Sequence, residues 1–153
     1  ALYVIIAGVL AAVLLERLLT YAEAAEKAAM EATISRLHAA LYVRVAYHAL
    51  RGESREIEAL AAQSPFAARD QSTNYLGEFD SLPAGAEGGT WLFDRSRREL
   101  VYVPKLHRYL TAGSGAGALT SIRYRVEILT DSRKAFSGVA LRPLGDPRWE
   151  PLP

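Results

Sequence analysis

Apolar and polar residues divide this chain into three successive stretches, and the first is almost wholly apolar. Residues 1–15 contain no charged side chain, and their only polar side-chain group is the hydroxyl of Tyr3. Fifteen helical residues span about 22 Å, whereas a bilayer core about 30 Å thick requires about 20 apolar residues. Apolar residues resume after Glu16 and Arg17, whose long side chains can extend toward headgroups. We therefore expect residues 1–21 to form a helix that enters a membrane or packs against other helices.

The second stretch, residues 22–51, has the composition and spacing of a helix. It is rich in Ala, Glu, Lys, Arg and Leu, which are strong helix formers. Glu23 and Lys27 are spaced to form an i,i+4 ion pair in the favourable order, and Lys27 and Glu31 one in the reverse order. Gly52 is a natural stop. The whole pattern predicts one helix of about fifty residues, roughly 75 Å long. Apolar residues recur at spacings of three and four and form one stripe along it: Met30, Ile34, Leu37, Leu41 and Val45.

Such a helix is too long to be covered by the rest of the chain. A domain of about one hundred residues has a radius of gyration of about 13 Å, so it can cover only the half that carries the stripe. The first half is apolar on all sides and requires lipid or other copies of the chain around it. A cleavable signal peptide fits poorly, because no basic residue precedes the apolar run and the helical pattern continues behind it.

The third stretch, from residue 53 onward, changes to the pattern of a small α+β domain. Ser54 is expected to cap a short helix over 55–63, which Pro65 ends. Three segments are expected to be irregular: a connection at 64–90, a flexible loop at 111–118 and an extended tail at 143–153. Four segments have the pattern of strands and predict an antiparallel sheet on which the long N-terminal helix packs: 90–94, 99–104, 121–130 and 136–141.

One segment of the first stretch resembles a known family. Gly8-Val9-Leu10-Ala11-Ala12-Val13 is similar to the Gly-Ile-Leu-Ala-Ala-Ile run of type IV pilins and of the pseudopilins of type II secretion systems, in which a long helix also leads into a small sheet. The resemblance implies a structural subunit that resides in the bacterial inner membrane. Pilus or secretion assembly machinery then incorporates it into a periplasmic or extracellular helical filament of identical subunits. Residues 1–21 would form the membrane and filament-core helix, and residues 22–153 the rest of the subunit.

Two departures from the family pattern qualify this interpretation. The family's glutamate near the mature N-terminus has no counterpart around Ile5, and Ala1 is not the usual phenylalanine or methionine. Alignment of Gly8 with the family glycine places about six family residues before Ala1, so we expect a mature start upstream, or a tip-type member without the glutamate. The absence of cysteine, and so of the family's disulfide-bounded C-terminal region, favours a pseudopilin.

The filament interpretation assigns packing roles along the first helix. Glu16 and Arg17 are candidates for charge pairing between subunits. Large side chains would be buried against neighbouring copies, and small residues would permit close approach of the helices. The large residues are Val4, Ile5, Val9, Leu10, Val13 and Leu14, and the small ones are Ala7, Gly8, Ala11 and Ala12.

Composition and motifs argue against an enzyme. The formal net charge is +1 and cysteine is absent, so thiolate metal sites and thiol nucleophiles are excluded. No Walker A, HExxH or nucleophile-elbow motif occurs, and neither a cofactor nor a metal is expected. We assign structural or surface roles to His38, His48 and His107. Gly113–Gly117 is expected to form a loop rather than a phosphate site, and Asp131 is at most a weak candidate for a calcium ligand.

Residues 95–134 carry nine basic residues against three acidic ones and suggest a second class of function. A basic sheet face could bind nucleic acid or acidic groups of a neighbour, although a solvated outer face has the same pattern. The alternative hypothesis is therefore a single-pass envelope protein, or a tip-type minor pseudopilin, whose domain binds a partner or nucleic acid. The candidate basic surface consists of Arg95, Arg97, Arg98, Lys105, Arg123 and Arg125.

Overall fold

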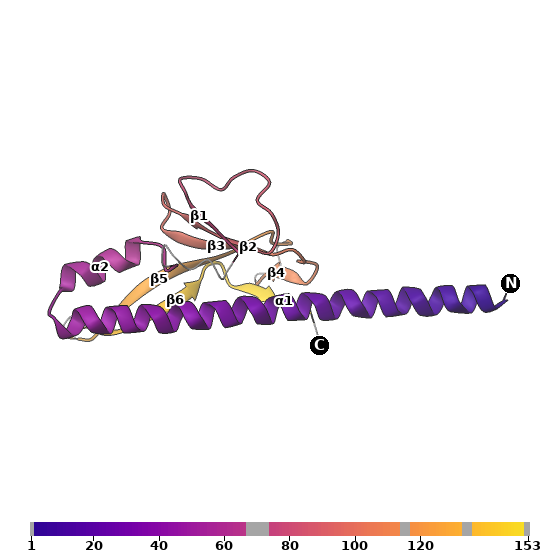
Figure 1. The fold of residues 1–153 in the computed structure, drawn as a ribbon, viewed down its shortest axis with the longest axis horizontal. Helices are drawn as coiled ribbons and strands as arrows, with labels where there is room; N and C mark the ends of the chain where they lie inside the picture. Colours follow the sequence, from indigo (N-terminus) through magenta and orange to yellow (C-terminus); the bar gives the residue numbers. More distant parts are fainter. Residues whose placement is uncertain (1, 67–73, 114–116, 133–135, 152–153) are drawn as a thin grey trace.

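The computed structural model describes residues 2–66, 74–113, 117–132 and 136–151 and has an α+β fold. Its dominant element is the continuous helix α1, Leu2–Leu50, which confirms the predicted helix of about fifty residues. Figure 1 shows that the C-terminal half of α1 lies against the remaining elements, while the N-terminal half projects beyond them. The predicted fold class, a long N-terminal helix packed on a small and mostly antiparallel sheet, is thus confirmed.

The predicted stripe is the face of α1 that packs on the domain. Met30, Leu37, Leu41 and Val45 are all buried there, at 5% exposure or less. Glu23 and Thr33 are buried on the same face, so the stripe begins earlier and is more polar than its apolar members indicate. The opposite face also carries large apolar side chains that remain exposed, namely Tyr42, Val43, Tyr47 and Leu50.

A short second helix, α2, Ser54–Ala62, follows a sharp corner. Gly52 adopts a φ of 70° at this corner, which favours glycine and agrees with its predicted role as a stop. The predicted cap was wrong: Glu53 rather than Ser54 is at the N-cap position, and its side chain makes no capping bond. Its carboxylate instead accepts hydrogen bonds from His48 Nδ1 and Arg51 Nε, each at 2.7 Å. Both bonds lower the pKa of Glu53, and the bond from His48 contributes the larger part.

The main sheet has five strands in the order β1-β2-β3-β5-β6, and a separate pair is formed by β4 and β7. All neighbours in the main sheet are antiparallel except β1 and β2, which run parallel. The four predicted strands are present as β2, Thr90–Asp94; β3, Glu99–Val103; β5, Ile122–Thr130; and β6, Phe136–Pro143.

Three strands lie where irregular structure was expected, and those expectations were wrong. β1, Tyr75–Phe79, lies in the connection; β4, Leu110–Ala112, overlaps the predicted loop; and β7, Pro147–Trp149, lies in the predicted tail. β1 contains a glycine with a φ of 114° and none of its side chains is fully buried, while β4 and β7 have three residues each. Such short or half-exposed strands carry too little alternation to be recognised. Residues 67–73 of the connection and 114–116 of the loop lie outside the described part of the chain.

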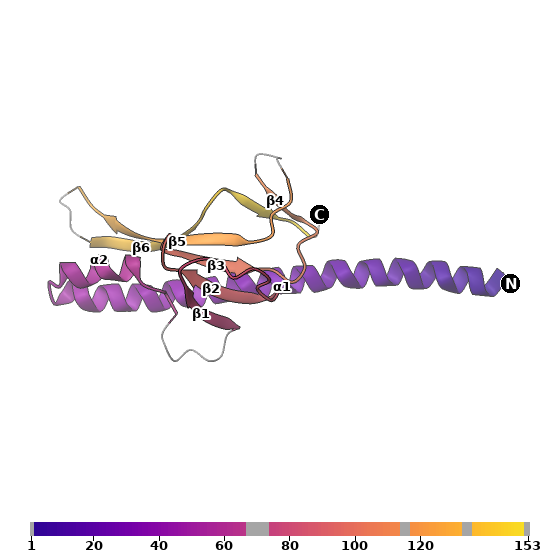
Figure 2. The same ribbon diagram turned by 90° about the horizontal axis from the view of Figure 1, so that it is seen from above.

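Two hydrophobic clusters join the helices to the sheet. The first lies between the middle of α1 and the aromatic face of β2, β3 and β5, where Trp91, Tyr102 and Tyr124 pack with Met30 and Leu37. The second lies nearer the end of α1 and also buries α2 and parts of β5 and β6. Seen from above in Figure 2, β5 and β6 run alongside the C-terminal half of α1. These clusters fix the domain on one half of the helix and leave the other half uncovered.

Candidate functional site

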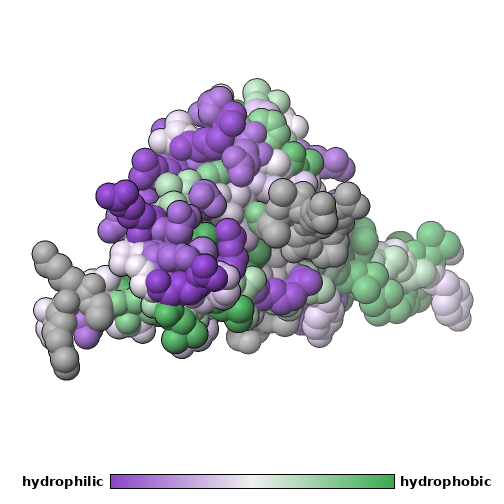
Figure 3. Space-filling view, turned by 60° about the vertical axis from the view of Figure 1, so that its left-hand side comes forward, coloured by the Kyte–Doolittle hydropathy of each residue, from purple (hydrophilic) through white to green (hydrophobic). Residues whose placement is uncertain are grey.

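The projecting half of α1 is the most exposed apolar surface of the described chain. All ten residues to which packing roles were assigned lie on it and are exposed. The exposed fraction is 75% for Val4, 64% for Ile5 and 65% for Leu10. Figure 3 shows hydrophilic residues over much of the globular domain and hydrophobic ones along the helix that recedes from it. By length and composition, this helix is long and apolar enough to cross a membrane, which is weak support for a membrane anchor.

Exposure of this surface to water is costly. Full burial of a Val, Leu or Ile side chain contributes about 1.5–3 kcal/mol. Single exposed apolar residues are ordinary, but contiguous apolar surfaces of this length mark contact with protein or lipid. A large set of apolar side chains on the segment is 47% or more exposed: Leu2, Tyr3, Val4, Ile5, Ile6, Val9, Leu10, Val13, Leu14, Leu15, Leu18 and Leu19.

Gly8 is unexpected within this exposed helix. A Cβ added there would have no neighbouring atom within 4 Å, so nothing in the described chain requires a glycine at this position. Glycine in a helix interior is less stable than alanine by roughly 0.5–1 kcal/mol. Small residues on apolar helices let another helix approach closely, and Ala7, Ala11 and Ala12 surround Gly8 in the sequence.

Below the projecting half, two glutamates of α1 attach the helix to the domain. Glu26 Oε1 accepts hydrogen bonds from the Tyr102 hydroxyl at 2.9 Å and from the backbone N–H of Lys105 at 2.6 Å. Its second oxygen, Oε2, accepts one from the backbone N–H of Leu106 at 2.9 Å. Burial and the hydrogen bond to Glu26 raise the pKa of Tyr102 above its ordinary range. One carboxylate thus holds the end of β3 and the loop that follows it.

Glu23, one turn earlier, is only 2% exposed. Its Oε1 accepts both the backbone N–H of Tyr109, at 2.9 Å, and Nε1 of Trp149, at 2.8 Å. Of the two i,i+4 pairs that the spacing predicted, Lys27–Glu31 is present at 3.8 Å, whereas the prediction of a pair between Glu23 and Lys27 was wrong. Sequence reasoning missed the attachment role of both glutamates. Spacing could have indicated it, since Glu23 and Glu26 continue the stripe of Met30 toward the N-terminus.

The two candidate charges for pairing between subunits lie where α1 leaves the domain. Glu16 pairs within its own chain with Arg108, at 3.6 Å, and both side chains are more than 60% exposed. Arg17 makes no ion pair with any residue that the structure describes. Exposed pairs of this kind contribute little to stability, so a role of Glu16 and Arg17 between subunits stays a prediction.

A groove with a volume of about 550 Å³ opens beside these two residues. One wall is the exposed side of α1 and the other is the domain surface next to β4 and β7. The Tyr109 hydroxyl lies 3.5 Å from that of Thr20 across the groove, and the Arg108 guanidinium lies 5.7 Å from the centre of the Tyr109 ring. The groove is lined by Val13, Glu16, Arg17, Thr20, Tyr109, Glu150 and Pro151.

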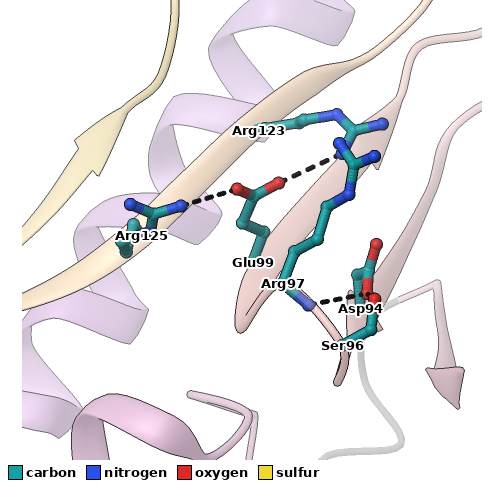
Figure 4. A network of polar contacts seen from close by, with 6 residues as sticks. All are labelled: Asp94, Ser96, Arg97, Glu99, Arg123 and Arg125. Atoms are coloured by element: carbon teal, nitrogen blue, oxygen red, sulfur yellow. Dashed lines mark hydrogen bonds and ion pairs between the residues drawn. The ribbon is translucent and has the colours of Figure 1, made fainter. Parts of the chain in front are cut away.

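The candidate basic surface is partly neutralised by acidic residues. Arg123 and Arg125 lie on either side of the buried carboxylate of Glu99, at 3.1 and 2.8 Å (Figure 4). Arg95 pairs with Asp80 at 3.0 Å. Three of the six candidate residues are therefore engaged within the chain, and their pairing reduces the positive charge available to a partner.

The remaining basic residues do not lie on one strand face. Arg97 and Arg98 are in the turn between β2 and β3, which the buried Asp94 organises by accepting hydrogen bonds from the Ser96 hydroxyl and the Arg97 N–H (Figure 4). Burial opposes the charged form of Asp94, but these bonds outweigh it and lower the pKa of this carboxyl. Lys105 is exposed at the opposite end of β3. Binding of nucleic acid by this surface stays a prediction.

Two of the three histidines have structural contacts. His38 Nε2 lies 2.8 Å from the carbonyl oxygen of Val139, and His48 holds Glu53. His107 is exposed. Among residues 2–66, 74–113, 117–132 and 136–151, no three histidine or acidic residues lie close enough together to hold a metal ion.

Comparisons with known proteins add no functional assignment. No family model, no curated protein and no solved structure matches this chain. The fold itself, a long N-terminal apolar helix on a mostly antiparallel sheet, is consistent in shape with that of pilins.

Proposed function

We propose that this chain is a structural subunit of a type IV pilus-like or pseudopilus filament and that it polymerises through the apolar half of α1. The proposal rests on one observation about α1: its C-terminal half packs against the folded domain, whereas its N-terminal half is apolar and exposed on every side. In a filament the apolar halves form a shared core and the domains form the outside. Before assembly, the same half resides in the bacterial inner membrane, and the assembly machinery of a pilus or secretion system extracts it into the periplasm or beyond.

The small residues favour a filament over a simple anchor. A membrane anchor needs only apolar side chains, and glycine weakens its helix. Close helix packing, in contrast, benefits from a surface such as that of Ala7, Gly8 and Ala11. Identical helices that pack side by side with a lengthwise stagger make a contact that does not close on itself, and such contacts generate open helical assemblies.

The test compares bulky substitutions on this helix. Gly8→Leu and Ala12→Leu are expected to abolish filaments sheared from expressing cells, as seen by negative-stain electron microscopy, and to leave membrane insertion intact. Val43→Leu is the matched control, because Val43 is 67% exposed on the half of α1 that carries the domain and is not among the residues proposed to pack between subunits. Mass spectrometry of the fibres identifies the chain and its N-terminal peptide.

Two results would count against the proposal. Filaments that persist in both bulky variants would exclude close packing at Gly8 and Ala12. An unmodified chain that stays monomeric in membranes would overturn polymerisation altogether. That outcome would favour the alternative, a single-pass envelope protein or tip-type subunit whose domain binds a partner.

A further inference from the structure

The border between the apolar and polar parts of α1 can be placed on the structure. From Leu2 to Leu15, the last residue before the first charged pair, the helix rises about 21 Å, and we place the edge of the bilayer core, which is about 30 Å thick, at Leu15. The layer of lipid headgroups on each side of that core is about 5–7 Å thick. When the projecting half enters a membrane, as the proposed function requires, the headgroups therefore surround the turns that contain Glu16, Arg17 and Thr20.

The groove of about 550 Å³ lies across this border. Along α1 it reaches from Val13 to Thr20, about 10 Å, so one end lies at the level of lipid acyl chains and the other at the level of headgroups. Its domain wall is Tyr109, Glu150 and Pro151. The groove thus has Val13 at the level of the membrane core and Glu16 and Arg17 at the level of the headgroups.

The charges beside the groove have both signs. Glu16 and Glu150 supply two carboxylates, Arg17 supplies one guanidinium, and Arg108 supplies a second through its pair with Glu16. The sum of these four charges is zero, so the groove offers no net attraction to an anionic lipid. A zwitterionic headgroup, with its phosphate on the arginines and its ammonium on the carboxylates, matches both signs at once.

The kind of ammonium can also be argued. A primary ammonium donates charge-assisted hydrogen bonds to carboxylates, whereas a quaternary ammonium is recognised by the faces of aromatic rings. Among the described residues that line the groove, Tyr109 carries the only aromatic ring, and the guanidinium of Arg108 already lies over it at 5.7 Å.

We propose that this groove binds one phospholipid with a primary-ammonium headgroup, phosphatidylethanolamine in chemical class, and that the bound lipid seats the globular domain on the membrane. The inference rests on the membrane-inserted state of the proposed function but not on polymerisation. Arg17 and Arg108 would hold the phosphate, Glu16 and Glu150 the ammonium, and Val13 and Pro151 the first carbons of the acyl chains.

The experiment measures lipid binding to the full chain in detergent by native mass spectrometry. Phosphatidylethanolamine, phosphatidylcholine and phosphatidylglycerol with identical acyl chains are added in turn. We expect phosphatidylethanolamine to bind most tightly. Arg17→Gln should lower the affinity for all three lipids about tenfold, because one charged hydrogen bond to the phosphate that they share is lost. Glu150→Gln should lower the affinity for phosphatidylethanolamine only. Glu58→Gln, on the exposed side of α2, is the matched control and should leave the affinity for all three lipids unchanged.

Each outcome decides the proposal. A preference for phosphatidylglycerol, equal binding of the three lipids, or an equal effect of Glu150→Gln and Glu58→Gln would overturn it. Glycerophosphoethanolamine, which lacks acyl chains, should not compete, and full competition would assign the groove to a soluble phosphate ester instead. Insertion is scored separately in vesicles from the protection of a label at Val9→Cys, which would be the chain's single cysteine. Loss of that protection contradicts the proposed function, whereas protection without lipid preference contradicts only this inference.

Discussion

Replacement of Glu26 by glutamine tests how the helix is attached to the domain. Both oxygens of Glu26 are acceptors, since Oε1 receives the Tyr102 hydroxyl and the Lys105 N–H, and Oε2 receives the Leu106 N–H. Glutamine has one acceptor oxygen and one NH₂ donor, so in either orientation the NH₂ group faces a backbone N–H. One charged hydrogen bond is lost, a partly buried donor is left without a partner, and the remaining bonds lose their charge. We expect Glu26→Gln to lower the free energy of unfolding by about 2–4 kcal/mol.

Glu23→Gln is the matched comparison. Both partners of Glu23, the Tyr109 N–H and the Trp149 Nε1–H, bind the single oxygen Oε1. Glutamine retains that oxygen, and the substitution also removes a charge from a site that is 2% exposed, which offsets part of the loss. We therefore expect a cost of about 1 kcal/mol or less, even though Glu23 is the more buried residue. Glu31→Gln, at an exposed i,i+4 pair, should cost under about 0.5 kcal/mol.

The assay is urea unfolding of the full chain in detergent micelles, followed by tryptophan fluorescence. A second readout comes from the absorbance of ionised tyrosine, since removal of the Glu26 carboxylate should bring the pKa of Tyr102 back toward its ordinary value while burial keeps it raised. A cost for Glu23→Gln equal to or above that for Glu26→Gln would refute the argument from acceptor geometry, because burial rather than oxygen use would then govern the effect.

Three further predictions follow from packing and titration. A Cβ at Gly88 would lie 2.7 Å from Cα of Lys105, so Gly88→Ala should lower the free energy of unfolding by about 1–3 kcal/mol. Gly138→Ala should lower it less, because a Cβ there would lie 3.6 Å from its nearest neighbour, and equal unfolding midpoints of the two variants would contradict this. Burial raises the pKa of Tyr124 to about 12, so its contribution to stability is present below about pH 10 and is lost as the pH rises toward 12. Stability measured from pH 9 to 12 should fall less steeply in Tyr124→Phe, and an unchanged slope would be inconsistent with this assignment. Leu41 is 1% exposed in the cluster that joins α1, α2 and the sheet, and Leu41→Ala should lower the free energy of unfolding by about 2–5 kcal/mol. An unchanged thermal unfolding midpoint would exclude tight packing of this second cluster.

The sequence predicted the elements whose pattern is long and regular. The stripe from Met30 to Val45 identified the buried face of α1, and the alternation of β5 placed Ile122, Tyr124 and Val126 on its buried side. These predictions succeeded because burial of one face imposes a period of 3.6 on a helix and of 2 on a strand, and the period accumulates over many residues.

What the sequence did not predict depends on contacts between distant segments. β4 and β7 are three residues each and exist because they pair with one another, with Leu110 opposite Trp149. The attachment by Glu23 and Glu26 depends on backbone N–H groups whose position is set by the loop after β3, and no local pattern records that position. The groove similarly brings residues 13–20 of α1 together with Tyr109 and residues 150–151, so the sequence alone could not show that their charges lie side by side.

The bond between Glu23 and Trp149 has a consequence for biosynthesis, since its two partners are 126 residues apart in the chain. At a translation rate of about 5–20 residues per second, roughly 6–25 s pass between the synthesis of the two side chains. Throughout that interval the apolar half of α1 has been synthesised, but the last strand of the surface on which the helix docks does not exist. The nascent chain therefore presents its apolar helix before its own domain is complete. Under the proposed function, insertion of that helix into the membrane therefore begins before the domain is complete and competes with aggregation of the exposed helix.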